Sequence, residues 1–257
     1  MVRSPIDRQR NVQIRAVEFQ GRFHAVLTRA AEAGRQREPD AAEIGPYITI
    51  SRQAASGGAE IARMVADRWG WSVLDKELVE DIARRLEVAP RLLELMDETR
   101  TNWFSGSFLT LLEPRLLTQD SYVLMLGKIV LLAAYDGRVV IVGRGAGLML
   151  PREPGLAVRV IAPREARLAR LCREEGLDPR VAAKRLDQIE ASRENFVRRH
   201  LRCDPQDPAC YDLVVDSEAL GLEGAAELIC HAAELRGLTR TRPVRPLPRS
   251  RRPAGVP

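Results

Sequence analysis

A turn of small residues follows the first strongly apolar segment of the chain, and its residue types are those that bind phosphate. The segment Tyr47-Ile-Thr-Ile-Ser-Arg-Gln-Ala-Ala-Ser-Gly-Gly-Ala-Glu-Ile-Ala62 predicts a strand, a turn and the start of a helix. Backbone N–H groups in such a turn, together with the dipole of the helix, favour an anion. One interpretation is an ordinary strand-to-helix turn. The other is a phosphate cradle formed by Ser51, Arg52, Ser56, Gly57 and Gly58.

This turn lacks two side chains that the phosphate-binding P-loop, G-x-x-x-x-G-K-[ST], normally supplies. When the motif is aligned on the following helix, Gly57 stands at the last glycine, Gly58 replaces the lysine and Ala59 replaces the Ser/Thr that holds magnesium. Arg52 is the candidate for the missing cation. Because arginine is a planar fork and lysine a compact point charge, the exchange is expected to change how phosphate is held.

Two further strand ends carry polar side chains. Asp75 follows the apolar run Trp71–Leu74, and Arg144 follows the run Val139–Gly143 between two glycines. A guanidinium presented in this way suits bidentate binding of a phosphate, and an ion pair with a nearby carboxylate is the alternative. Asp75 is predicted either to cap the next helix or to reach a ligand.

A basic helix is predicted over residues 179–201, with Asp178 as its N-cap and Pro179 at its first position. It carries, among others, Lys184, Arg185, Arg193, Arg198 and Arg199, and Arg202 follows it. Such a charge run is usually a solvated face. The loop after it, Cys203-Asp-Pro-Gln-Asp-Pro208, leads to the last predicted strand, which is where a lid would close over a transferring phosphate. Arg193 is predicted to act from this lid.

These side chains need a sheet that brings the strand ends together. Apolar runs predict five short buried strands, the first from Tyr47 and the others at 71–74, 139–143, 157–162 and 212–216. Helical stretches between and after them are predicted at 59–69, 76–86, 120–135, 164–175, 179–201 and 223–236. This alternation predicts an α/β fold with a five-stranded parallel sheet and helices on both faces. Ligands of such sheets bind at the carboxyl ends of the strands.

The composition suits one globular domain with appendages: of 257 residues, 45% are hydrophobic and 29% charged. We expect an N-terminal helix and linker at 1–45, the main domain at 46–237 and a disordered tail at 238–257. The tail contains six arginines, five prolines and no acid, and it carries more than the whole formal charge of +5. A solvated tail is expected, with weak binding of an anionic partner such as RNA or lipid as the alternative.

The chain has no run of 18 apolar residues and no apolar segment at its N-terminus, so we expect a cytoplasmic protein without a membrane span. Its four cysteines have no C-x-x-C spacing and its histidines number only three, so no metal site is predicted and the cysteines are expected to be thiols in a reducing compartment. Apolar stretches near Phe108 and Val123 leave two alternatives open, a domain core or the face of a homo-oligomer.

Several segments together resemble a known family. They are Ile48-Thr-Ile-Ser-Arg52 with Ser56-Gly-Gly58, Leu74-Asp-Lys-Glu-Leu78, Val140-Ile-Val-Gly-Arg144, Val158-Arg-Val-Ile-Ala-Pro-Arg-Glu-Ala-Arg167 and Tyr211-Asp-Leu-Val-Val-Asp-Ser217. In this order the chain resembles the cytidylate kinase-like proteins, relatives of bacterial cytidylate kinase within the P-loop nucleoside monophosphate kinases, over roughly residues 46–236. The resemblance implies a P-loop kinase-like fold with a helical acceptor and lid region. It also implies ATP with Mg²⁺ as donor and a nucleoside monophosphate, nominally CMP, as acceptor.

The same resemblance implies roles for individual residues. The donor cradle would be the turn described above, the acceptor would meet Asp75 and Arg144, and the catalytic cations would be Arg52, Arg144 and Arg193. Two positions depart from the family pattern: Gly145 stands where an acidic residue helps to read the nucleotide, and Leu186 stands where the lid has an arginine. Charged positions of the lid signature that do match are Asp187, Glu190 and Arg193.

We therefore hypothesise a phosphotransferase with a degenerate P-loop. The alternative is a nucleotide-binding regulatory or interaction module on the same fold, which no longer transfers phosphate. A third hypothesis is a scaffold that binds partners through its N-terminal helix and basic tail.

Overall fold

The computed structural model describes residues 44–75 and 121–239. Along the chain these residues form β1 (Tyr47–Arg52), α2 (Gly58–Trp69), β2 (Ser72–Leu74), α6 (Ser121–Asp136), β3 (Val139–Val142), α7 (Ala146–Met149), β4 (Gly155–Ile161), α8 (Arg164–Glu175), α9 (Pro179–Leu201), η4 (Pro208–Cys210), β5 (Leu213–Asp216) and α10 (Ser217–Leu235). The strands form one sheet in the order β2-β3-β1-β4-β5, and all neighbours are parallel. The predicted α/β class with a five-stranded parallel sheet is confirmed.

Strand β1 lies at the centre of the sheet, between β3 and β4. Tyr47 through Ile50 are all buried, which is typical of a parallel strand covered on both sides. Its Ile50 pairs in register with Val142 of β3 and Val158 of β4. The carboxyl ends of these three strands therefore lie side by side.

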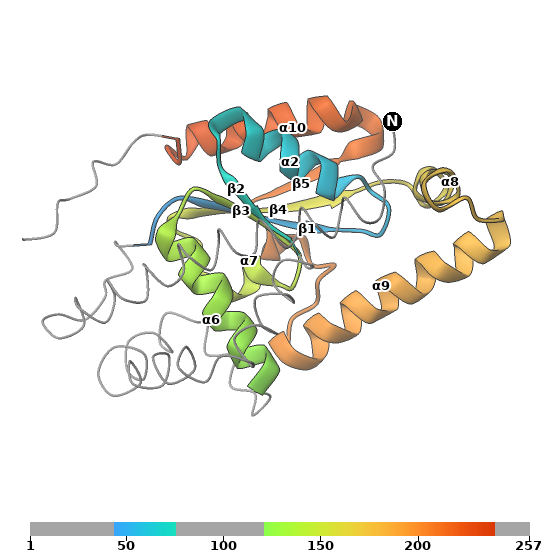
Figure 1. Ribbon diagram of the computed structural model, residues 1–257, viewed down its shortest axis with the longest axis horizontal. Helices are drawn as coiled ribbons and strands as arrows, with labels where there is room; N and C mark the ends of the chain where they lie inside the picture. Colours follow the sequence, from blue (N-terminus) through green and yellow to red (C-terminus); the bar gives the residue numbers. More distant parts are fainter. Residues whose placement is uncertain (1–43, 76–120, 240–257) are drawn as a thin grey trace, which may run out of the picture.

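Helices cover the two faces of the sheet, as Figure 1 shows: α2 and α10 lie on one face, and α6 and α7 on the other. Apolar side chains of α2 and α10, such as Ile61 and Ile229, pack on the first face with Ile48. On the second face, α6 packs together with α7 and with Val197 and Leu201 at the end of α9. The helices packed on the two faces thus hold the strand ends in fixed positions.

Most predicted boundaries agree with the structure to within two residues, and helices α8 and α9 have the predicted bounds. Helix α10 begins at Ser217 instead of at 223, because the Asp216 carboxylate caps it by accepting from the N–H groups of Glu218 (2.9 Å) and Ala219 (3.2 Å). Gly221, with a φ of 70°, then interrupts the helical backbone. The four-residue helix α7 was not predicted.

Some predictions lie outside the described residues. They are the N-terminal helix before residue 37, the helix at 76–86 and the tail from 240 onward. Among the described residues, no helix combines the length and apolarity needed to cross a lipid bilayer.

Candidate functional site

A cavity of about 570 Å³ opens where β1, β3 and β4 end and where α9 passes over them. Of the residues that the structure describes, five arginines line it but only two carboxylates, those of Glu190 and Glu194. The arginines come from the strand ends and from α9: Arg52, Arg144, Arg159, Arg185 and Arg193. A partly enclosed site with this excess of guanidinium groups is suited to a phosphate-bearing ligand.

The turn after β3 presents Arg144 in a conformation that is unusual for arginine. Gly143, Arg144 and Gly145 have consecutive positive φ angles of 82°, 55° and 67°. The left-handed region costs a residue with a Cβ roughly 1–2 kcal/mol. The Arg144 guanidinium lies 5.8 Å from the ring centroid of Phe196 on α9. Strain at a residue that faces a cavity is typical of a functional position.

The Arg52 side chain crosses from β1 to the turn after β3. Its Nη1 packs against Gly143, so that a Cβ at that glycine would overlap it. Its carbonyl oxygen accepts a hydrogen bond of 3.1 Å from Nη1 of Arg193. The structure therefore brings all three predicted catalytic arginines, Arg52, Arg144 and Arg193, to one cavity.

The glycine turn lies at the N-terminus of α2, and its first residues, Gln53 and Ala54, line the cavity. Ser51 lines the cavity, whereas Ser56, Gly57 and Gly58 are not among its lining residues. The buried Ser56 hydroxyl lies 3.0 Å from the carbonyl oxygen of Gln53, to which it donates. In this geometry the turn offers an anion its backbone N–H groups instead of a serine hydroxyl. Asp75 follows β2 at the sheet edge and does not line the cavity either.

Arg170 of α8 is a candidate that the sequence analysis missed. Its Nη1 is buried without a hydrogen-bond partner among the described residues, and it lies against Gly57, where a Cβ would overlap it. Because a buried N–H group without an acceptor costs free energy, this position is suited to a bound anion. The signal in the sequence is the recurrence of arginine every three residues, at Arg164, Arg167 and Arg170.

Arg167 fixes the glycine turn relative to α8 and to α9, the helix of the predicted lid. It is buried, its Nε donates to the carbonyl oxygen of Ala162 (2.9 Å), and its Nη1 lies 2.5 Å from Oε1 of Glu190 and 3.4 Å from the carbonyl oxygen of Ala54. One guanidinium therefore connects the turn, the start of α8 and the middle of α9. Glu190, which matches the lid signature of the family, is engaged in this structural contact.

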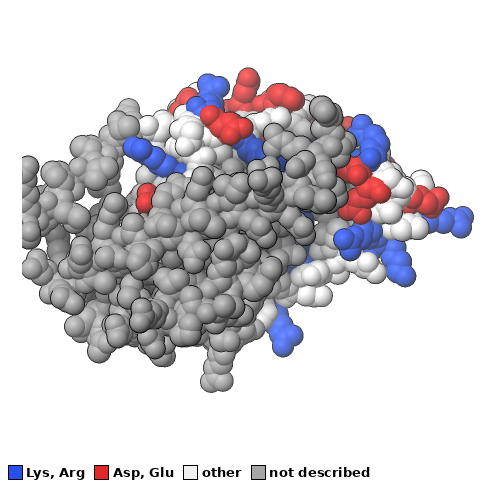
Figure 2. All heavy atoms as spheres, viewed as in Figure 1, with Lys and Arg blue, Asp and Glu red and all other residues white. Residues whose placement is uncertain are grey.

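The other matching acid, Asp187, also joins the two helices. It accepts two hydrogen bonds from the exposed Arg164, at 2.6 and 3.1 Å, which hold the pKa of its carboxyl below its ordinary value. Leu186 is buried against Leu171 and Ala54. The leucine that replaces the expected arginine thus packs the helices together. Figure 2 shows that acidic and basic side chains are mixed over the surface of α8 and α9.

Ser217 holds the glycine turn from the opposite side. Its buried hydroxyl lies 2.7 Å from the carbonyl oxygen of Ser56 and 3.1 Å from that of Ile161. We expect Ser217→Ala to lower the free energy of unfolding by about 1–3 kcal/mol, since buried carbonyl groups lose their donor. Urea unfolding of this variant beside Ser192→Ala, on α9, measures the effect. Equal stability of the two variants would contradict this role.

The sheet and the cationic cavity at its carboxyl edge define a P-loop kinase-like protein of the α/β class. The profile of the cytidylate kinase-like family matches residues 47–219, so the chain belongs to this family. It is 33% identical to the cytidylate kinase of Methanocaldococcus jannaschii over 104 residues, which cover 39% of this chain and 58% of that protein, less than two thirds of its length.

Two further relatives extend over more of the chain. The cytidylate kinase of Archaeoglobus fulgidus is 24% identical over 205 residues, which cover 74% of this chain and 95% of that protein. The solved structure of an uncharacterized protein from Eubacterium ventriosum is similar to this chain with a TM-score of 0.56 and 17% sequence identity. The superposition covers 73% of this chain and 98% of that protein. The last comparison supports the fold alone.

Proposed function

We propose that this protein is a nucleoside monophosphate kinase that transfers the γ-phosphate of ATP to CMP or a related small acceptor. The cavity lined by five arginines at the carboxyl ends of β1, β3 and β4 carries the proposal. Phosphoryl transfer needs positioning and neutralisation of charge more than covalent chemistry, and fixed guanidinium groups supply both. Membership of the cytidylate kinase-like family supports a phosphorylated nucleotide as the ligand.

The donor side of this proposal uses the glycine turn. Backbone N–H groups at the start of α2 and the buried Nη1 of Arg170 form a donor set that fits the phosphates of ATP. From the end of β1, Arg52 packs against Gly58, and Ser51 lines the neighbouring cavity. We propose that Ser51, Arg52 and Arg170 form the donor cradle together with the backbone N–H groups of Ser56, Gly57 and Gly58.

Magnesium fits the proposal as part of the nucleotide complex. Among the described residues, no three side chains of His, Cys, Asp or Glu gather around a common point. Kinases commonly bind Mg²⁺ through substrate phosphates, water and one or two protein oxygens. Ser51, which lines the cavity, offers such an oxygen. When bound, the ion would neutralise charge on the β- and γ-phosphates.

The acceptor side uses the turn after β3. Arg144 would bind the phosphate of the monophosphate, Arg52 would lie between donor and acceptor, and Arg193 would act from α9. Asp75, which follows the edge strand β2, would approach the acceptor from the side. Their shared task is to stabilise negative charge on the phosphoryl group as it moves between the two oxygens.

The second candidate function is a nucleotide-binding regulatory or interaction module without turnover. It is favoured by the start of α2, where Gly58 and Ala59 provide neither the cation nor the hydroxyl of an ordinary P-loop. Backbone groups and arginines would then still bind phosphate. The two functions differ in one observable, the formation of a phosphorylated product.

The test is a phosphoryl-transfer assay with ATP and Mg²⁺ against CMP, dCMP, UMP, AMP and GMP. Turnover that Arg52→Ala and Arg144→Ala both abolish would establish the kinase and name its acceptor. ATP binding by calorimetry without turnover would establish the regulatory module. Folded protein with neither binding nor turnover would contradict both functions.

The role of Arg170 is tested by a matched pair of variants on α8. Arg170→Met removes the cation beside Gly57, and we expect it to weaken ATP binding at least about tenfold, as the loss of a charge-assisted hydrogen bond does. Arg173→Met, on an exposed position of the same helix, is expected to leave the affinity unchanged. Calorimetric titration of both variants gives the comparison. Equal affinities would remove Arg170 from the donor cradle.

A further inference from the structure

The segment that joins α9 to β5 brings two cysteines into contact. Sγ of Cys203 lies 3.1 Å from Sγ of Cys210, and all four cysteines are present as thiols. The two cysteines stand seven positions apart in the sequence and do not form a C-x-x-C motif. The sequence therefore did not indicate that they are in contact. The formation of a disulfide requires the two sulfur atoms to approach by about 1 Å.

The two thiols differ in their access to solvent. Cys203 is half-buried, whereas Cys210 is buried with 8% of its surface exposed. Burial, followed by the hydrogen bond with Cys203, raises the pKa of the Cys210 thiol to about 11. An oxidant therefore reaches Cys203 first, and Cys210 lies behind it as the second thiol. An accessible cysteine beside a second cysteine is the usual arrangement of a redox-sensitive pair.

The segment between these cysteines forms part of the cavity rim. Pro205 and Gln206, which lie between the cysteines, line the cavity together with Tyr211, which directly follows Cys210. The carbonyl oxygen of Pro205 accepts hydrogen bonds from Nη1 of Arg159 and from the Tyr211 hydroxyl, the latter at 2.9 Å. The Gln206 side chain donates to Oε1 of Glu194 on α9 at 2.6 Å. A covalent link between the two ends of this segment would hold these three residues on the rim.

We propose that Cys203 and Cys210 form a redox modification site, at which a peroxide produces a reversible disulfide that fixes the segment 203–210 on the cavity rim. The Cys203 thiolate attacks one peroxide oxygen, the O–O bond breaks, hydroxide leaves, and a sulfenic acid forms. The Cys210 thiolate then attacks the Cys203 sulfur, the S–O bond breaks, and a second hydroxide leaves.

The two steps together consume one peroxide and two thiols. The sulfur atoms lose two electrons, the peroxide gains them, and the two hydroxide ions take up the thiol protons to form two molecules of water. A small thiol reverses the modification by exchange and is itself converted to a disulfide. In a reducing compartment, where cysteine pairs form disulfides transiently, such a site reports an oxidant.

The first experiment maps the disulfide in the full-length protein. Reduced protein is treated with hydrogen peroxide, remaining thiols are blocked with N-ethylmaleimide, and the chain is digested. Trypsin leaves Cys203, Cys210 and Cys230 on one peptide, because no lysine or arginine lies between 203 and 235. A protease that cuts before aspartate, at Asp204 and Asp207, separates the pair, so that mass spectrometry detects two peptides joined by the disulfide.

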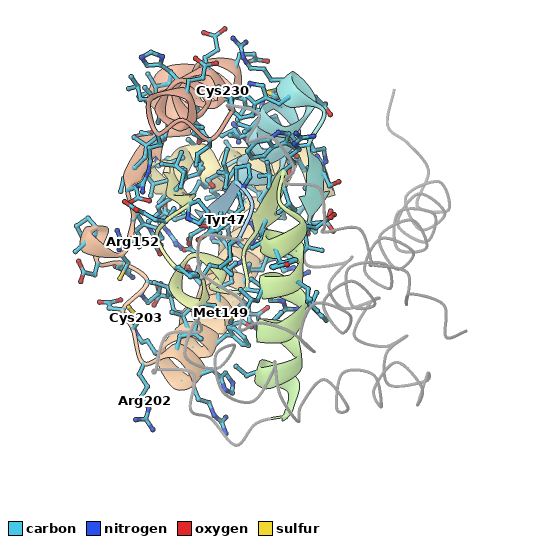
Figure 3. All side chains as sticks on the ribbon, turned by 90° about the vertical axis from the view of Figure 1, so that its left-hand side faces the viewer. Tyr47, Met149, Arg152, Arg202, Cys203 and Cys230 are labelled. Atoms are coloured by element: carbon cyan, nitrogen blue, oxygen red, sulfur yellow. The ribbon has the colours of Figure 1, made fainter. Side chains whose placement is uncertain are left out.

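The matched variants separate this pair from the other cysteines. Figure 3 shows Cys230 near the top of the view and Cys203 well apart from it, in the lower half. We expect the double variant Cys172→Ser/Cys230→Ser to form the disulfide as the unsubstituted protein does, and Cys203→Ser or Cys210→Ser to abolish it. A small thiol is expected to restore the free thiols. Absence of the joined peptides from folded, peroxide-treated protein would overturn the proposal, as would indiscriminate pairing with Cys172 or Cys230.

Thermal unfolding tests whether the disulfide fixes the segment. Closing a loop of this length is expected to raise the Tm by on the order of 5 °C in the oxidised protein. Cys210→Ser treated with peroxide is the control and is expected to show no rise. An unchanged Tm in protein that carries the disulfide would contradict the fixed segment. Neither measurement requires a nucleotide, so the outcome is independent of the proposed phosphoryl transfer.

Discussion

Replacing Arg144 by glycine is expected to lower kcat/KM for the nucleoside monophosphate by about 10²–10³-fold without destabilising the fold. The guanidinium that would bind the acceptor phosphate is lost. The substitution also removes backbone strain, because glycine adopts the φ of 55° without the steric cost that arginine has there. Relief of that strain offsets the greater freedom of glycine in the unfolded chain. Loss of activity should therefore come with an unchanged or higher free energy of unfolding.

Arg138 provides the control for this prediction. It is also an arginine with a positive φ, of 51°, and it also follows a glycine, but it precedes β3 at the sheet edge opposite the cavity. Arg138→Gly is expected to retain full activity and to change stability as Arg144→Gly does. The measurements are steady-state kinetics with the acceptor varied and urea unfolding of both variants. Full activity of Arg144→Gly would remove this residue from the acceptor site.

The second large effect concerns the contact between Arg167 and Glu190. Their side chains are 6% and 23% exposed, so the pair is largely removed from water. We expect Arg167→Met to lower the free energy of unfolding by about 3–5 kcal/mol, because the Glu190 carboxylate is left without its cation. Urea unfolding followed by circular dichroism measures the loss.

Two comparisons make the Arg167 prediction specific. The exposed pair of Arg164 and Asp187 joins the same two helices, with side chains 51% and 59% exposed, and Arg164→Met is expected to leave stability nearly unchanged. Arg167→Met/Glu190→Leu is expected to recover much of the loss, since no carboxylate then remains buried without a cation. Equal effects of the two single variants would show that burial does not govern this contact.

The parallel sheet was predictable because its strands are short apolar runs separated by helical stretches. The segment that begins at Tyr47 and the run that begins at Val139 are such apolar runs, and each is only a few residues long. The order β2-β3-β1-β4-β5 was not predicted, because apolar runs indicate burial on both faces but not which strands are neighbours.

The candidate site was predictable only in part. Arg52 and Arg144 stand at the ends of apolar runs, and the carboxyl ends of parallel strands are where such sheets bind their ligands. Arg167 and Arg170 lie in a helix of mostly charged residues, where arginine ordinarily indicates a solvated face. Whether such a side chain is buried depends on the packing of α8 against α9 and the glycine turn, which helical spacing alone does not determine. The contact of Cys203 with Cys210 depends in the same way on the path of an irregular segment.

The Arg167 guanidinium has a thermodynamic consequence for the two proposed nucleotide positions. Because it contacts the carbonyl of Ala54 in the turn and Glu190 in α9, a ligand that orders the turn also favours one placement of the helix. Linkage then makes the effect reciprocal: whatever factor ATP contributes to the affinity for the monophosphate, the monophosphate contributes to the affinity for ATP. We expect this cooperativity in a binding matrix of both nucleotides, and we expect it to vanish in Arg167→Met/Glu190→Leu, whose two separate affinities persist.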